Sequence, residues 1–172
     1  HSEVPGIDTV YMKTNDGLSW MSRWDTGAKR LGGYGPINGF EMVRLWERGY
    51  AGQGIEFIPW GVANGVQPGY AGNYAHDEGL MAGRIAVAAA DIREPATYIL
   101  DLEPHQHHPT GQGFWRDDLM AKGREVDEYI KGFKKAGGTD LWLCVDARSD
   151  FLNQVSLVYW LTGTKAQGIR TR

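Results

Sequence analysis

Short apolar stretches alternate along the chain with longer segments in which apolar residues recur at helical spacing. The apolar stretches predict strands over residues 9–14, 55–62, 97–103, 141–146 and 155–161. The segments with helical spacing predict helices over residues 39–50, 75–91 and 117–136, the last beginning as early as Phe114. Long loops follow the strands and short glycine turns follow the helices. This β-loop-α order predicts an α/β fold with a parallel sheet and crossover helices.

The number of predicted strands leaves three architectures open. A complete (β/α)-barrel has eight strands and about 250 residues, whereas these 172 residues contain about five predicted βα units. The chain is then part of a barrel, or a barrel completed by other domains or chains, or an open α/β sheet. With 42% hydrophobic and 23% charged residues, residues 1–172 have the composition of a single globular domain.

The predicted strand 97–103 is very apolar and ends in two carboxylates, Asp101 and Glu103, before Pro104. Side chains of a strand alternate between its faces, so these two point to the same side, with Cα atoms about 6.6 Å apart. Glycosidases use two such carboxyl groups, one protonated as the acid and the other ionised. The spacing predicts a catalytic pair, with Glu103 as general acid and Asp101 as its partner. The alternative is a strand end with solvated acids.

Other side chains at the predicted carboxyl ends of strands can join this pair, because those ends meet at one edge of a parallel sheet. Asp16 and Asp146 each follow a strand and can share the catalytic or substrate-binding role, or can simply form caps and turns. Lys13 can bind substrate or form a structural ion pair with Asp101 or Glu103. Trp60 can stack on a sugar face, and the alternative for this ring is core packing.

Charge and composition argue against several kinds of partner. The net charge of −3, the pI near 5.9 and the lack of a basic run give no support for nucleic-acid binding. No stretch is long and apolar enough to predict a membrane span. Cys144, the only cysteine, lies in an apolar run and is predicted to be a small core residue. The polar loop with His105, His107 and His108 could hold a metal, but a solvated loop is preferred, so no metal or cofactor is expected.

The motifs resemble those of the family 25 glycoside hydrolases and of similar bacterial and phage barrel proteins. Residues 10–17, VYMKTNDG, resemble a family element in which a hydrophobic strand is followed by Lys, an acid and Gly. Residues 98–103, YILDLE, resemble the strand that carries the Asp-x-Glu catalytic motif of the family. Residues 55–61, 141–148 and 158–160 resemble further strands of the same group.

The resemblance implies a parallel (β/α) barrel of TIM type, here incomplete. It implies cleavage of the glycan of peptidoglycan without a cofactor, with Glu103 as the acid beside Asp101. It also implies a sugar-facing site around Asp16, Trp60 and Tyr159.

We therefore expect a glycoside hydrolase-type domain whose partner is a polysaccharide, such as a cell-wall glycan, with an extracellular, cell-envelope or virion location. The alternative is a non-catalytic barrel domain that binds glycan or serves as a structural part of a larger surface or virion assembly. The Asp-x-Glu motif favours the enzyme. The alternative is favoured because the acid on the family's first strand and the family's last strands have no counterpart in these residues.

Overall fold

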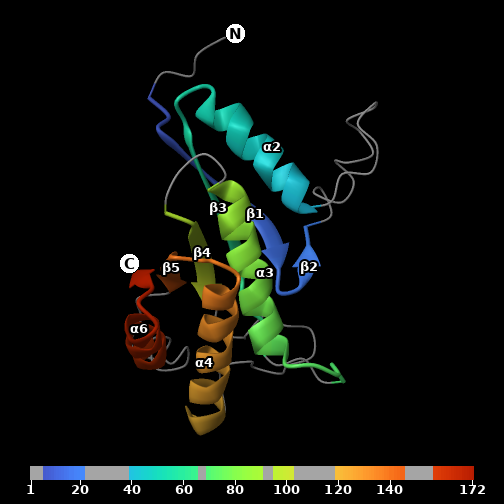
Figure 1. Cartoon of the computed structure of the whole chain (residues 1–172), viewed down its shortest axis with the longest axis vertical. Coiled ribbons are helices and arrows are strands. Elements are labelled where there is room, and N and C mark those ends of the chain that lie inside the picture. The colour runs from blue at the N-terminus through green and yellow to red at the C-terminus, as the bar shows by residue number, and fades with distance from the viewer. Residues whose placement is uncertain (1–5, 22–38, 66–68, 91–94, 103–118, 146–156) are drawn as a thin grey trace.

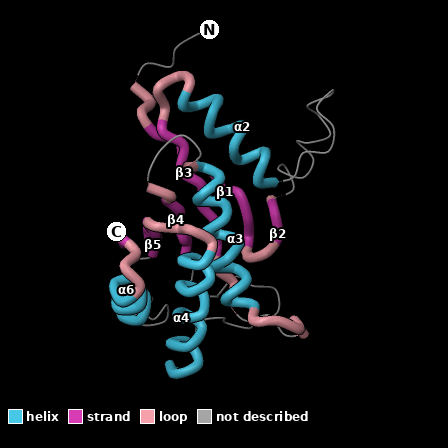
Figure 2. The backbone as a smooth tube through the Cα atoms, viewed as in Figure 1, coloured by secondary structure: helices cyan, strands magenta, loops and turns pink. Residues whose placement is uncertain are grey.

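The structure is a computed structural model that describes residues 6–21, 39–65, 69–90, 95–102, 119–145 and 157–172. These residues form one mostly parallel sheet and a layer of helices (Figures 1 and 2). The strands are β1 (Thr9–Asp16), β2 (Ser19–Trp20), β3 (Glu56–Val62), β4 (Thr97–Leu102), β5 (Asp140–Val145) and β6 (Arg170–Thr171). The helices are α2 (Gly39–Ala51), α3 (Tyr74–Ala89), α4 (Leu119–Lys135) and α6 (Leu157–Ala166).

The strands lie in the order β2-β1-β3-β4-β5-β6, so the five parallel strands follow one another across the sheet as they do along the chain. β2 is antiparallel to β1 and pairs only with its last two residues, Asn15 and Asp16. Within the described residues the sheet is open, with β2 and β6 at its two edges. The predicted α/β class is thus confirmed, and a closed barrel is not present in this part of the chain.

The helices cover one face of the sheet. Successive parallel strands joined by right-handed crossovers place every crossover helix on the same side. In agreement, side chains from α2, α3, α4 and α6 share one hydrophobic cluster with Tyr98, Leu100 and Leu102 of β4, which are each 1% exposed. Asn73 caps α3, accepting from the backbone N–H of His76 at 3.2 Å.

Helices α3 and α4 approach each other closely at three glycines. A Cβ on Gly79 would collide with the backbone carbonyl of Tyr129, and one on Gly132 would collide with that of His76. A Cβ on Gly83 would lie 2.5 Å from the carbonyl oxygen of Phe133. The obstacles are backbone atoms that cannot move aside alone, so the distance between the two helices depends on these residues having no side chain.

The predicted fifth strand at 155–161 is wrong, because the described part of this segment belongs to α6. Trp160 and Thr164, four residues apart, are fully buried, and the Thr164 hydroxyl donates to the Trp160 carbonyl at 2.7 Å. The neighbours Val158 and Tyr159 are both exposed, at 65% and 38%. A strand would have turned them to opposite faces. β-Branched and aromatic residues suggested a strand, but one-sided burial at helical spacing decides the conformation.

The other predicted strands and the three predicted helices are present in the described residues, close to their expected bounds. β1 is two residues longer than predicted, because Asn15 and Asp16 still pair with Gly61 and Val62 of β3 after a register shift following Lys13. No helix among the described residues is both long and apolar enough to cross a membrane.

Candidate active site

Side chains that alternate with the core residues point to the opposite face of the sheet, which we call the site face. On β4, Thr97, Ile99 and Asp101 are half-buried and alternate with the buried core residues. Register partners in neighbouring parallel strands share a face. The partners of these three β4 residues on β1, β3 and β5 therefore lie on the site face as well. The site face carries Tyr11, Lys13, Asp16, Ile58, Trp60, Val62, Thr97, Ile99, Asp101, Asp140, Trp142 and Cys144.

Two carboxylates lie in one row at the carboxyl edge of the site face. Asp16, Val62, Asp101 and Cys144 are register partners across β1, β3, β4 and β5. Two strand spacings separate the Cα atoms of Asp16 and Asp101 by about 10 Å. Side chains from such positions can bring carboxyl groups to the roughly 5–9.5 Å that glycosidases use.

A row of aromatic and basic side chains runs directly beneath these acids. Lys13, Trp60, Ile99 and Trp142 are register partners. The ammonium of Lys13 lies 5.3 Å from the centre of the Trp60 ring, and the guanidinium of Arg172 lies 5.0 Å from that of Trp142. Both contacts are in the range of cation–π attraction. The site face therefore offers flat rings and positive charge next to its carboxylates.

Asp16 is held by two neighbours. Its Oδ2 lies 3.4 Å from Lys13 Nζ, and its Oδ1 accepts from the Asn64 side-chain amide, also at 3.4 Å. The Asp16 side chain remains 50% exposed. Asp16 is thus oriented at the edge of the sheet while its carboxylate stays accessible to solvent.

Glu78 lies behind Asp16 and is a residue that the sequence interpretation missed. It is 2% exposed, and its two carboxyl oxygens accept from the backbone N–H groups of Asn64 at 2.8 Å and Gly65 at 2.7 Å. Burial raises the pKa of Glu78 to about 8, and the nearby charge of Asp16 adds to this rise. A detectable signal existed, because Glu78 is the single acid on the apolar face of α3 formed by Ala75, Ala82 and their neighbours.

A buried hydrogen bond between Tyr98 and Asn15 joins β4 to β1 on the helix-covered face of the sheet, near the carboxyl ends of the strands. The Tyr98 hydroxyl donates to Asn15 Oδ1 at 2.7 Å, and burial strongly raises the pKa of Tyr98. The ring crosses β3 at Gly61, where any Cβ would collide with the Tyr98 hydroxyl. Asn15 in turn donates to the Gly17 carbonyl at 2.9 Å. β4 is therefore connected to the turn that follows Asp16.

The structure brings four of the predicted site residues together: Lys13, Asp16, Trp60 and Asp101 share the carboxyl half of the site face. Glu103 and Asp146 lie outside the described residues, as do the three histidines of the predicted loop. Among the described residues, no group of three His, Cys, Asp or Glu side chains could hold a metal ion.

Two expectations about individual residues need correction. Tyr159 is on α6 and not on a strand, with its ring against Gly123 of α4, so it belongs to the helix layer and not to the site face. Cys144 is exposed and not a core residue. The reason is alternation on β5, where Leu141 faces the core while Trp142 and Cys144 face the other side.

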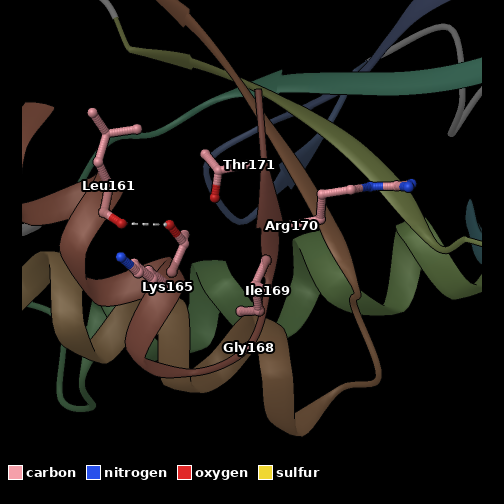
Figure 3. Close-up of a pocket in the computed structure, with 7 residues that line it drawn as sticks. Leu161, Lys165, Gly168, Ile169, Arg170 and Thr171 are labelled. Atoms are coloured by element: carbon pink, nitrogen blue, oxygen red, sulfur yellow. Dashed lines mark hydrogen bonds between the residues drawn. The ribbon is translucent and has the colours of Figure 1, made fainter.

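A groove of about 490 Å³ lies between α6 and β6 (Figure 3). Leu161 and Lys165 line it from the helix, and Ile169, directly before β6, and Thr171 of β6 line it from the other side. β6 pairs with the amino-terminal half of β5, so this groove is distant from the carboxyl edge. It contains no pair of carboxylates, and we do not assign the chemistry to it.

Comparisons with known proteins found no match. No protein-family model, no curated protein and no solved structure matches this chain.

Proposed function

We propose that this chain is a glycoside hydrolase-type domain that acts on a polysaccharide such as a cell-wall glycan. The observation that carries the proposal is the site face, where Asp16 and Asp101 share a row above Lys13 and Trp60. Carboxylates supply acid/base chemistry, and a flat ring beside a cation suits the apolar face and the polar groups of a sugar. No cofactor is needed for this reaction.

We further propose that the sheet is a sector of a parallel (β/α) barrel, continued by other domains or chains. Sequential strand order with helices on one face supports this architecture. A doubly wound sheet would reverse its order and carry helices on both faces. In a barrel the site face is the interior, and its carboxyl edge is where barrel enzymes hold their substrates.

In the proposed reaction, Glu103 is the general acid, in the role that the Asp-x-Glu resemblance implies. The sequence spacing predicts that Glu103 shares a face with Asp101. The acid gives its proton to the glycosidic oxygen as the bond to the sugar breaks, and a carboxylate stabilises the positive charge that develops on the ring. Water then supplies the oxygen that bonds the anomeric carbon, and its released proton restores the ionised acid. Asp101 and Asp16 are the candidates for that second role.

The expected result is that purified chain releases reducing ends from peptidoglycan or from chitin oligomers, and that Glu103→Gln lowers the rate by about 10²- to 10⁴-fold. Asp101→Asn is expected to lower it strongly as well. Glu56→Gln is the matched control, because Glu56 is the first residue of β3, at the amino-terminal end of the strand and away from the carboxylates. The rate of this variant should stay within about twofold of the parent. Equal rates in Glu103→Gln and the parent would contradict the catalytic assignment.

One observation favours a non-catalytic glycan-binding domain as the second candidate. Asp16 is already engaged by Lys13 and Asn64, as expected for a structural ion pair. Binding of the glycan by folded chain with no release of reducing ends, also after further strands are supplied, would select this alternative.

A further inference from the structure

We propose that Glu78 is a positioning residue for Asp16, acting through Asn64 in the loop between β3 and α3. The inference rests on the proposed function, in which Asp16 belongs to the glycan site. It adds a buried side chain of the helix layer to a site otherwise built on the opposite face of the sheet.

The contacts form a continuous path from Glu78 to Asp16. The Glu78 carboxyl accepts from two consecutive backbone N–H groups, those of Asn64 and Gly65, at 2.8 and 2.7 Å. These bonds fix the backbone at Asn64, whose side-chain amide donates to Asp16 Oδ1 at 3.4 Å. Bidentate acceptance by a buried carboxyl restricts the loop more than a single bond would, so the Asn64 amide stays directed at Asp16.

The turn at Gly17, which follows Asp16, packs closely against the side chains of Asn64 and Glu78. Gly17 has a φ of +54°, and a Cβ at this position would lie 2.7 Å from Glu78 Oε1 and 2.8 Å from the Tyr74 hydroxyl, and would collide with the Asn64 amide nitrogen. Gly17 also donates its backbone N–H to the Val62 carbonyl at 3.0 Å. Glu78 therefore supports Asp16 both through Asn64 and through the turn itself.

Asp16 is one of the titratable groups around Glu78, so the charge on Glu78 changes the electrostatic environment of the Asp16 carboxylate. The groups that face Glu78 are Asp16 from β1, Tyr74 from α3, Tyr98 from β4 and Tyr129 from α4. With its pKa raised to about 8, mainly by burial, the Glu78 carboxyl is mostly protonated at pH 7. Ionisation above that pH places a second negative charge near the Asp16 carboxylate.

The test is an NMR titration of the whole chain that follows the Asp16 carboxyl carbon and the Asn64 side-chain amide. Both signals are expected to change around pH 8, where Glu78 ionises. Glu78→Gln should abolish this change. Asp77→Asn, which alters the neighbouring acid that bonds Tyr70 and His76, should preserve it. No change around pH 8 in the parent chain, or the same change in Glu78→Gln, would overturn the proposal.

Asn64→Ala gives a second test if Glu78→Gln does not fold. The Glu78 carboxyl should still titrate in this variant, while the response of Asp16 falls to the part that direct charge repulsion and the turn carry. An undiminished response of Asp16 would show that Asn64 does not transmit the effect and would also overturn the proposal.

Activity separates this inference from the proposed function. If the chain hydrolyses glycan, Asn64→Ala should lower kcat about tenfold or more and leave KM within about twofold, because a misplaced group weakens the transition state more than binding. Hydrolysis without NMR coupling would refute the positioning role alone. Coupling without hydrolysis, also after further strands are supplied, would refute the glycosidase function alone.

Discussion

Replacing Gly79 by alanine is expected to lower the free energy of unfolding by about 3 kcal/mol or more. The new methyl group would collide with the backbone carbonyl of Tyr129 and lie 3.0 Å from the Phe133 nitrogen. Helices α3 and α4 would have to separate, and this strain exceeds the roughly 1 kcal/mol that alanine gains over glycine in a helix. Urea denaturation of the parent and the variant measures the difference directly.

Gly49→Ala is the matched control. Gly49 is an exposed residue of α2, and a Cβ there would meet nothing within 4 Å. The same substitution should therefore be neutral or stabilise the chain by up to about 1 kcal/mol. Equal effects at the two positions would show that close approach of α3 and α4 does not determine the outcome.

The second large effect is a loss of stability between about pH 4.5 and pH 8. The folded chain keeps the Glu78 proton up to about pH 8, whereas an unfolded glutamate loses it near 4.5. The folded state therefore binds more protons in this window, and the free energy of unfolding falls as the pH rises through it. The stabilisation is fully present below the window, and its loss amounts to at most about 5 kcal/mol.

Denaturation curves of the parent and of Glu78→Gln, recorded from pH 4 to pH 9, measure this effect. The amide cannot ionise, so the variant should lose most of the downward slope. Asp77→Asn should retain it, because Asp77 lies on the same helix but is partly exposed. A slope that is unchanged in Glu78→Gln would assign the pH dependence to other groups.

The sequence predicted the half of the site that strand patterns encode. Lys13 and Asp16 were found because a hydrophobic strand precedes them, and Trp60 and Asp101 because their strands are short and apolar. The alternation of side chains between the two faces of a strand predicts which residues point away from the core. The expected common face of Asp101 and Glu103 stays a prediction, because Glu103 lies outside the described residues. The order of the strands and the single helix layer required the structure.

The rest could not be predicted from local patterns. The pattern of α3 could have shown that Glu78 is a buried acid, but it could not show which groups Glu78 contacts. Asn64 and Gly65 carry no sequence signal that a carboxyl accepts their N–H groups. Tyr159 was misassigned because strand propensity and helical burial conflict around it. Packing of Trp160 against Tyr129, with ring centres 5.2 Å apart, favours the helix.

The most direct measurement of the central claim, that the site face is a glycan site, is an NMR titration of the amide signals with soluble glycan fragments of peptidoglycan. We predict that the signals of Lys13, Trp60 and Asp101 move together and that those of the buried α4 residue Val126 do not. Saturating glycan that leaves the site face unchanged, or that moves only residues of the groove between α6 and β6, would contradict the account.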